Sequence, residues 1–178
     1  PETIVARVCA LLRGRDDLAG KHVLVTAGPT REMVDPVRFL SNRSSGKMGY
    51  AIAEAAARRG ARVTLVSGPV ALDRPQGVET VPITSTLDLY REVTERAKAA
   101  DLVIQAAAPA DFRPLEAAQH KIKKTGEGMM LQLTPNPDVA AQLGRDKHDG
   151  QVLVAFAAET DDLIANARKK LDRKNADM

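Results

Sequence analysis

Short runs of valine, isoleucine and leucine alternate along most of the chain with longer segments in which apolar residues recur at helical spacing. This alternation is typical of βαβ units, in which helices join neighbouring parallel strands and cover the sheet. The apolar runs predict strands at residues 22–27, 62–67, 79–84, 101–107 and 151–157. The segments of helical spacing predict helices at residues 48–59, 86–99, 138–143 and 161–173. The pattern therefore favours an α/β fold with a mainly parallel sheet.

The two ends of the chain and one segment near residue 130 follow other patterns. Residues 4–15 carry apolar side chains close to helical spacing, so we expect residues 1–20 to be a linker helix that follows a preceding domain. The chain has no initiator methionine and ends without a helix stop signal, so we expect residues 21–178 to form one domain that is truncated at its C-terminal end. The alternation from Met129 to Leu133 predicts an edge or flap strand.

Composition is that of one globular domain. The chain has 178 residues, of which 44% are hydrophobic and only 3% aromatic, so aliphatic side chains must form the core. A single cysteine, Cys9, excludes an internal disulfide and a thiolate metal cluster. No run of about 18 apolar residues is present, and the first residues are not those of a signal peptide. We therefore expect a cytoplasmic protein that does not cross a membrane.

The positive charge is concentrated in two places, although the net charge of +3 is too small to predict nucleic-acid binding. Near the middle of the chain, strand alternation would place Lys121 and Lys123 on one face, beside Lys124. Near the end, the basic residues are Arg168, Lys169, Lys170, Arg173 and Lys174. Most such clusters are simply solvated, but a ligand with several phosphates would suit both of them, and a lysine on a flap can neutralise a triphosphate.

The loop after the first strand has the pattern of an anion site. It runs for about twenty residues from Gly28 to Gly49, whereas such connections usually have about 2 to 6. Ser44-Ser45-Gly46 stands at a helix start, where hydroxyl groups, backbone N–H groups and the helix dipole favour phosphate. A plain serine cap is the alternative, but anion binding is favoured by the other polar residues of this loop, Arg31, Arg38, Asn42, Arg43 and Lys47.

Two common phosphate motifs are excluded. Met48 stands where a P-loop needs serine or threonine. The second strand is followed by Val66-Ser67-Gly68-Pro69, which offers no acid for the ribose of a dinucleotide.

Three more segments lie where a parallel sheet binds ligands. Residues 106–113 combine small side chains, against which a flat ring could lie, with Asp111, which fits a helix cap or a surface acid as well as a base or ribose contact. Asp138 in Asn136-Pro137-Asp138 is expected to be an N-cap. Phe156 ends the fifth strand and is more typical of a core residue than of a stacking platform.

Together these motifs resemble those of the phosphopantothenate-cysteine ligase family in its bacterial, CTP-dependent form. The matching motifs follow the family order from about Lys21 onward: Gly28-Pro29-Thr30, Asp35-Pro36-Val37-Arg38, Ser41-Asn42-Arg43-Ser44-Ser45-Gly46-Lys47-Met48-Gly49, Lys121-Ile122-Lys123-Lys124, Asn136-Pro137-Asp138 and Phe156-Ala157-Ala158-Glu159-Thr160. The resemblance implies a Rossmann-like three-layer sandwich with a mainly parallel sheet and a small flap or dimerisation extension.

The resemblance also implies a reaction. CTP would activate the carboxylate of 4'-phosphopantothenate as an acyl-cytidylate with release of pyrophosphate, and L-cysteine would displace CMP, giving 4'-phosphopantothenoylcysteine on the route to coenzyme A. Mg²⁺ or Mn²⁺ would accompany the triphosphate. Family members form homodimers or higher homo-oligomers, and neither nucleic acid nor a membrane is an expected partner. In bacteria this ligase is usually the C-terminal half of a bifunctional protein, and FMN would belong only to the decarboxylase half, which precedes it and is absent here.

Site residues follow from the same resemblance, while metal ligands do not. It implies that Asn42 holds the acyl-cytidylate and that Lys121 is needed to form it. Nucleotide contacts would come from Gln105, Ala106, Ala107, Asp111, Lys121, Pro137, Asp138, Val139, Ala140, Phe156, Lys170 and Lys174. The phosphate-loop candidates are Gly28, Ser44, Ser45 and Gly46.

The family pattern normally continues past the position of Met178 into a further strand, so we expect parts of the phosphopantothenate site and of the dimer to lie beyond this sequence. Two other interpretations remain. Thr26-Ala27-Gly28 and the alanine-rich fourth strand are similar to NAD(P)-binding Rossmann oxidoreductases, although neither Tyr50 nor Tyr90 has a lysine four residues on. The basic clusters are also compatible with a non-catalytic nucleotide-binding module.

Overall fold

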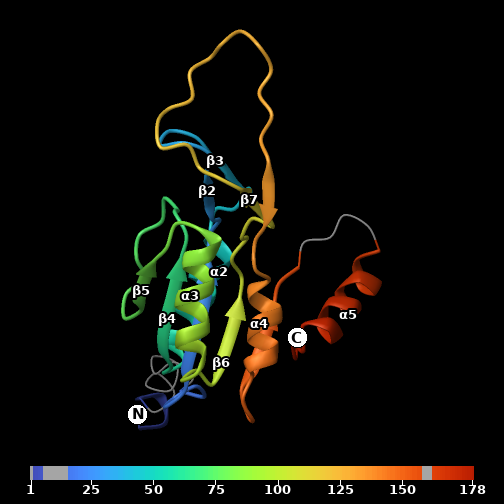
Figure 1. Cartoon of the computed structure of the whole chain (residues 1–178). Coiled ribbons are helices and arrows are strands. Elements are labelled where there is room, and N and C mark those ends of the chain that lie inside the picture. Colours follow the sequence, from blue (N-terminus) through green and yellow to red (C-terminus); the bar gives the residue numbers. More distant parts are fainter. Residues whose placement is uncertain (1, 6–15, 158–161) are drawn as a thin grey trace.

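The structure, a computed structural model, describes residues 2–5, 16–157 and 162–178. Its centre is a sheet of five parallel strands in the order β5-β4-β1-β6-β9 (Figure 1). These strands are β1 (His22–Ala27), β4 (Arg62–Ser67), β5 (Glu79–Pro82), β6 (Leu102–Gln105) and β9 (Val152–Ala155). The first and second predicted strands are confirmed at both ends, and the other three are confirmed in place but are shorter than predicted.

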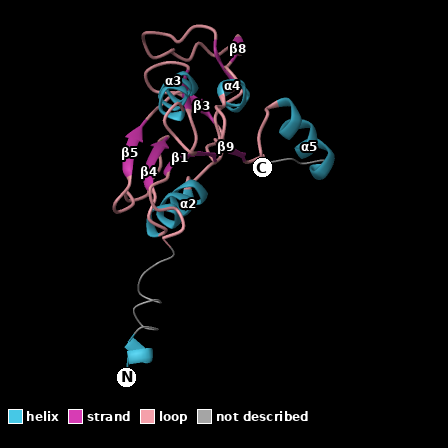
Figure 2. Ribbon diagram, turned by 90° about the horizontal axis from the view of Figure 1, so that it is seen from below, coloured by secondary structure: helices cyan, strands magenta, loops and turns pink. Residues whose placement is uncertain are grey.

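Helices cover both faces of the sheet, as the sequence pattern predicts. On one face lies α2 (Lys47–Arg58), and on the other lie α3 (Thr86–Ala97) and α4 (Val139–Asp146) (Figure 2). The two faces bury separate cores: Val23, Val25 and Leu65 pack with α2, whereas Leu24 and Val103 pack with α3 and α4. These positions alternate along each strand because successive side chains point to opposite faces. The three-layer α/β fold is therefore confirmed.

The last described helix, α5 (Leu163–Arg173), lies beside the β9 edge of the sheet (Figure 2). The chain after it contacts α4, where Asn175 Nδ2 donates to the carbonyl of Gly144 at 2.8 Å. It then reaches β9, where the N–H of Asp177 donates to the carbonyl of Leu153 at 2.8 Å. Residue 161, the predicted start of this helix, lies outside the described residues.

Two antiparallel hairpins stand beyond the carboxyl ends of the strands. One pairs β2 (Arg31–Met33) with β3 (Phe39–Ser41), and the other pairs β7 (Phe112–Pro114) with β8 (Leu133–Pro135). The hairpins contact each other through β2 and β7. The loop between β7 and β8 extends farther from the sheet than any other part of the described chain (Figure 1). The family resemblance implies a small flap or dimerisation extension, and this pair of hairpins lies outside the three layers; its part in dimerisation stays a prediction.

The predicted strand from Met129 to Leu133 is wrong. Only Leu133 belongs to a strand, which continues to Pro135 and pairs with β7. Met129 and Met130 are 57% and 97% exposed, so the apolar alternation there has no buried face to stabilise a strand. The expectation that Lys121 and Lys123 share a strand face is also wrong, because residues 121–124 lie in the loop and form no strand.

Near the N-terminus, residues 2–5 are helical, and residues 6–15 of the expected linker helix lie outside the described residues. Leu18 packs against the core on the α2 face, and its N–H donates to the carbonyl of Arg59 at 3.0 Å. The boundary between linker and domain stays a prediction. Across the described ranges, the structure contains no helix with the length and hydropathy needed to cross a membrane.

Candidate functional site

The loops that follow β1 and β6 meet at the carboxyl edge of the sheet. Pro29 and Ala108 form a parallel bridge, and the N–H of Ala108 donates to the carbonyl of Gly28 at 2.9 Å. The hydroxyl of Thr26 accepts the N–H of Ala107 at 3.0 Å. These contacts extend the pairing of the two strands beyond the sheet, so backbone rather than bulky side chains lines this part of the edge. A ligand site at this position agrees with the general rule for parallel sheets.

Glycines allow α2 to begin directly against the end of β1. The N-cap of α2 is Gly46, which has a left-handed backbone with φ 77°, and a Cβ added there would lie 2.7 Å from Val70 Cγ1. A Cβ on Gly49 would lie 2.6 Å from both Ala27 Cβ and the carbonyl oxygen of Thr26. The first turn of α2 is therefore held close to the sheet edge.

The two serines before α2 do not cap it. The cap has no side-chain hydrogen bond among the described residues, and the only serine contact in this segment is a long one, from the N–H of Gly46 to Ser44 Oγ at 3.4 Å. Ser45 is exposed. The alternative of a plain serine cap is therefore wrong, and the N–H groups of the first turn stay available beside two hydroxyl groups.

Asn42, which follows β3, reaches across to the loop after β6. Its Nδ2 donates to the carbonyl of Pro109 at 2.8 Å. The residue before it, Ser41, is held by a hydrogen bond from its hydroxyl to the carbonyl of Thr30 at 2.7 Å. The side chain of Asn42 is thus placed where the hairpin and the sheet edge meet.

Asn136 joins that loop to the start of α4. Its Nδ2 donates to the carbonyl of Ala110 at 2.9 Å, and its N–H donates to the carbonyl of Asp111 at 2.8 Å. Arg113 Nη1 in turn donates to Asn136 Oδ1 at 3.0 Å. Asp111 itself is exposed beside this junction. Sequence analysis had found Asn136 only as part of a motif, because hydrogen bonds to distant carbonyls leave no local pattern.

Asp138 is the N-cap of α4, as predicted, and accepts the N–H of Ala141 at 3.0 Å. Lys174, which directly follows α5, forms an ion pair with it at 3.1 Å. Desolvation opposes ionisation of Asp138, but the Ala141 N–H and the Lys174 ammonium outweigh it and keep the pKa of Asp138 below its usual value. Lys174 is therefore brought to the start of α4, and Lys170 lies one turn earlier on α5.

Phe156 and Gln105 flank the end of β6. The side chain of Phe156 is 53% exposed, so its interpretation as a core residue is wrong, while its N–H donates to the carbonyl of Gln105 at 3.1 Å. Gln105 is buried, and its Nε2 has no hydrogen-bond partner within the described part of the chain. By strand alternation the Gln105 side chain faces the same side as Val103, which packs with α4.

Lys121 lies apart from this edge, on the loop between β7 and β8, and is exposed. Its neighbour Ile122 is bound by the turn between β2 and β3. Ile122 donates its N–H to Asp35 Oδ2 at 3.1 Å and accepts from Arg38 Nη2 at 2.7 Å. Sequence analysis named Asp35 only as part of a matching motif and counted Arg38 among the residues that favour anion binding, whereas the structure pairs Arg38 with Asp35.

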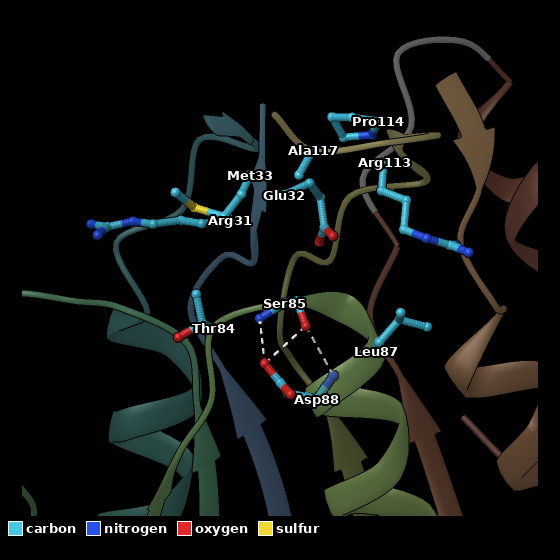
Figure 3. A pocket seen from close by; sticks show the side chains of 10 residues that line it. All are labelled: Arg31, Glu32, Met33, Thr84, Ser85, Leu87, Asp88, Arg113, Pro114 and Ala117. Atoms are coloured by element: carbon cyan, nitrogen blue, oxygen red, sulfur yellow. Dashed lines mark hydrogen bonds between the residues drawn. The ribbon is translucent and has the colours of Figure 1, made fainter. Parts of the chain in front are cut away.

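A separate hollow of about 350 Å³ lies between the hairpins and the start of α3 (Figure 3). Its lining consists of Arg31, Glu32, Met33, Thr84, Ser85, Leu87, Asp88, Arg113, Pro114 and Ala117. Glu32 accepts the N–H and the hydroxyl of Thr86 at 2.9 and 2.8 Å, and Asp88 forms a capping box with Ser85. Both carboxylates therefore hold α3 in place. None of the site residues that the resemblance implies lines this hollow, although Arg31 of the predicted anion loop does, so we take the sheet edge as the candidate site.

Residues 18–178 match the family described as the DNA/pantothenate metabolism flavoprotein C-terminal domain, and the chain belongs to this family. The coenzyme A biosynthesis bifunctional protein CoaBC of Bacillus subtilis is 53% identical over 162 residues, covering 90% of this chain and 40% of that protein. The CoaBC protein of Haemophilus influenzae is 45% identical over 178 residues, covering 100% of this chain and 44% of that protein.

Among solved structures, the crystal structure of the C-terminal domain of CoaBC is similar to this chain with a TM-score of 0.79 and 48% identity, covering 89% of this chain and 75% of that one. The chain spans less than half the length of the two CoaBC relatives from Bacillus subtilis and Haemophilus influenzae. The resemblance found in the sequence, to the C-terminal half of a bifunctional protein of coenzyme A biosynthesis, is confirmed, as is the Rossmann-like fold.

Proposed function

We propose that this chain carries the ligase reaction that the sequence motifs imply, the CTP-dependent joining of 4'-phosphopantothenate to L-cysteine. The observation that carries the proposal is the convergence of its polar groups on one sheet edge. The uncapped start of α2, the amide of Asn42 and the Asp138–Lys174 pair at the start of α4 all lie around the loop after β6. Membership in a family whose similar relatives are named for coenzyme A biosynthesis supports the same proposal.

In the first step, a carboxylate oxygen of 4'-phosphopantothenate attacks the α-phosphorus of CTP, and the bond to the β-phosphate breaks to release pyrophosphate. The ammonium group of Lys121 offsets the negative charge that accumulates on the α-phosphate and the leaving pyrophosphate. Backbone N–H groups at the start of α2, with Ser44 and Ser45, offer further donors for phosphate.

In the second step, the amine of L-cysteine attacks the acyl carbon and CMP leaves. Asn42 is suited to hold the acyl-cytidylate, because an amide NH₂ has two hydrogens and the Pro109 carbonyl takes only one of them. A neutral amide donates to an acyl or phosphate oxygen without adding charge.

The nucleotide would lie along the loop after β6, with its base against the backbone of Gln105, Ala106 and Ala107. Asp111 and the exposed ring of Phe156 border this strip. The start of α4, with Pro137, Asp138, Val139 and Ala140, faces it with N–H groups, and Lys170 and Lys174 would supply positive charge for the phosphates.

A divalent cation, Mg²⁺ or Mn²⁺, would accompany the triphosphate. Among the described residues no group of three or more histidine, cysteine, aspartate or glutamate side chains is placed to hold a metal, so phosphate oxygens would supply most of its ligands. FMN would belong to the decarboxylase half of a bifunctional protein.

We further propose that the chain acts as a homodimer or higher homo-oligomer joined through its hairpins. Large apolar side chains of all four short strands are exposed, which is typical of an interface. They are Met33, Phe39, Phe112 and Leu133.

Pyrophosphate release tests the ligase proposal directly. Release is measured from CTP and from ATP, with 4'-phosphopantothenate present or absent, for this chain and for a version extended past Met178. We expect release that requires both CTP and 4'-phosphopantothenate. Equal release from ATP contradicts the CTP preference, and no release by either folded version contradicts the ligase proposal.

The two alternatives have their own measurements. The residue at the end of β4, where a dinucleotide ribose needs a carboxylate, is Ser67. Its hydroxyl donates to the carbonyl of Gly68. Protection by NADPH against thermal unfolding would nevertheless favour an oxidoreductase. Nucleotide or oligonucleotide binding with steep salt dependence and no preference for CTP would favour a non-catalytic module.

A further inference from the structure

Asp35 is a fully buried carboxylate in an otherwise exposed turn. Its side chain has 0% exposure, whereas Pro36, Val37 and Arg38 around it are exposed. The Oδ1 atom accepts the N–H groups of Val37 and Arg38, both at 2.8 Å, and these two bonds close the turn between β2 and β3. The turn is thus complete with only one of the two carboxylate oxygens.

The second oxygen, Oδ2, binds two partners. One is the guanidinium of Arg38, through Nε at 2.9 Å and through Nη2. The other is the N–H of Ile122, which lies 87 residues away in the sequence, at 3.1 Å. A buried charge requires such partners, because an unpaired ionised carboxylate away from water is strongly unfavourable.

Arg38 binds the same distant residue from the other side of its peptide. Its Nη2 also donates to the carbonyl of Ile122 at 2.7 Å. Both backbone polar groups of one loop residue are therefore fixed by one ion pair. We call these three residues, Asp35, Arg38 and Ile122, the clamp.

The clamp holds a point on the long loop between β7 and β8. Residues 121–132 contain no strand or helix and are mostly exposed. A second link lies three residues before Lys121, where the N–H of Ala118 donates to the carbonyl of Val34 at 2.9 Å. Lys121 therefore stands between two fixed points on the same turn, and its Cα lies about 3.8 Å from that of clamped Ile122.

We infer that Asp35 is a positioning residue for Lys121: through Arg38 and the backbone of Ile122, it fixes the base of the lysine side chain while leaving the ammonium group free to reach the triphosphate. This inference rests on the proposed function of Lys121 in the first step. Asp35 touches no reacting atom and acts only through the backbone. Its role is to reduce the conformational freedom that the lysine would otherwise lose in the transition state.

Asp35→Asn is the direct test, because an amide has one acceptor oxygen where the carboxylate has two. Its NH₂ group must face either Arg38 and the Ile122 N–H or the N–H groups of the turn, and it repels both. Asp101→Asn is the matched control. Asp101 also accepts a backbone N–H, from His22 at 2.8 Å, and pairs with a cation, Lys21, at 3.0 Å, but it does so at the opposite end of the sheet. Lys121→Gln and the double variant complete the set.

Two readouts are compared in the version of the chain that is active in the pyrophosphate assay. The first is hydrogen exchange of the Ile122 amide, which we expect to be protected in the parent, in Asp101→Asn and in Lys121→Gln, and to lose protection in Asp35→Asn. The second is the rate of pyrophosphate formation. We expect Asp35→Asn to slow it on the order of 100-fold with little change in the KM for CTP, because misplacing a catalytic group by about 1 Å has an effect of this size. The double variant is expected to be no slower than Lys121→Gln, since both single changes disrupt the same interaction between the lysine and the triphosphate.

Three results would overturn the inference: unchanged Ile122 protection in Asp35→Asn, a loss of rate no larger than in Asp101→Asn, or independent losses that multiply in the double variant. If Asp35→Asn does not fold, Arg38→Lys serves instead, because it keeps a cation beside Asp35 but cannot hold the carboxylate and the Ile122 carbonyl in the same way. A parent that makes no pyrophosphate contradicts the proposed function and this inference together, whereas an active parent with an unaffected Asp35→Asn contradicts the inference alone.

Discussion

Single side chains in the hairpins and in the loops beyond the sheet gain their importance from the backbone groups that they bind. Asp35 accepts three backbone N–H groups and a guanidinium, and the amides of Asn136 and Asn42 each donate to one backbone carbonyl. Each of these side chains ties together segments that are far apart in sequence or lie in loops without regular structure. Substitution at these positions is therefore expected to affect geometry at a distance as well as local stability.

The ionisation of Asp35 predicts a pH-dependent contribution to stability. The Arg38 guanidinium lowers the pKa of Asp35 most, burial opposes this, and the N–H groups of Ile122, Val37 and Arg38 lower it further. Because the folded pKa lies below the unfolded value of about 3.9, the contribution is complete above that value and is lost as the pH falls through the folded pKa. The difference in urea midpoint between the parent and Asp35→Asn should be constant above about pH 5 and shrink below about pH 4. A difference that stays constant into strong acid would contradict this.

Asn42 and Lys121 are expected to separate the two half-reactions. Asn42→Asp replaces a donor with a carboxylate that faces the Pro109 carbonyl, so it should still release pyrophosphate but leave the acyl-cytidylate unconsumed, slowing CMP release about 100- to 1000-fold. Lys121→Gln should block pyrophosphate release itself. Rapid-quench measurement of both products in the same samples distinguishes these effects. Equal loss of both steps in both variants would disprove this division of roles.

At the residue scale, sequence predicted best what depends on local spacing. The N-cap role of Asp138 was predicted correctly because an acid before a helical segment binds N–H groups of the same segment. The interpretation of Phe156 as a core residue failed, since an aromatic at a strand end is equally compatible with exposure. Asp35 and Asn136 went unassigned because their decisive partners, Ile122 and the carbonyls of the β6 loop, are distant in sequence.

The contact between α2 and β1 depends on a glycine within the helix. In most exposed helix positions, glycine to alanine stabilises by about 1 kcal/mol. At Gly49 the sign should reverse, because the added Cβ would lie 2.6 Å from the carbonyl oxygen of Thr26, which is part of the sheet and cannot move aside. We expect Gly49→Ala to lower the free energy of unfolding by about 1–3 kcal/mol.

Gly128→Ala is the matched control for this prediction, since a Cβ at Gly128 meets no atom within 4 Å. Its free energy of unfolding should change by less than about 0.5 kcal/mol. The free energies of unfolding of both variants are to be measured by urea unfolding, followed by circular dichroism. Stabilisation by Gly49→Ala would show that α2 does not rest on the end of β1 as closely as described.

At the element scale, long strands and helices were predictable and short hairpins were not. β1 and β4 are buried along almost their whole length, so their sequences are continuous apolar runs with clear ends. The strands of the hairpins have only three residues each and lie in polar, proline-containing segments. β7 and β8 also depend on pairing with a distant partner, as Phe112 pairs with Pro135, and such pairing leaves no local periodicity.

For the molecule as a whole, the sequence predicted the layers but not the strand order. Alternating strands and helices require a sheet covered on both faces, and the long loop after β1 pointed to its carboxyl edge. The order β5-β4-β1-β6-β9 and the placement of Lys121 on a loop outside the sheet depend on how segments pack in space. The same packing leaves the hairpins with an exposed apolar surface that includes Phe39 and Phe112.

The exposed apolar surface of the hairpins predicts a homo-oligomer that a single introduced carboxylate in this surface would dissociate. Phe39 on β3 is 42% exposed, and the guanidinium of Arg31 lies 4.6 Å from its ring. We expect light scattering after gel filtration to give at least twice the chain mass of 19.1 kDa for the parent. Phe39→Glu should give the mass of one chain, because burying an unpaired carboxylate in an apolar interface is unfavourable, whereas in the monomer the introduced carboxylate lies in water beside Arg31.

Ile164→Glu is the control for this assembly, because Ile164 is also a large apolar residue, 70% exposed, but lies on α5 and away from the hairpins. It should leave the mass unchanged, and circular dichroism should show both variants folded. A parent that is monomeric at concentrations where it makes pyrophosphate would show that assembly through the hairpins is not needed for the first step. Loss of assembly in Ile164→Glu but not in Phe39→Glu would place the interface on the α5 side of the molecule instead, because the introduced charge acts only where it becomes buried.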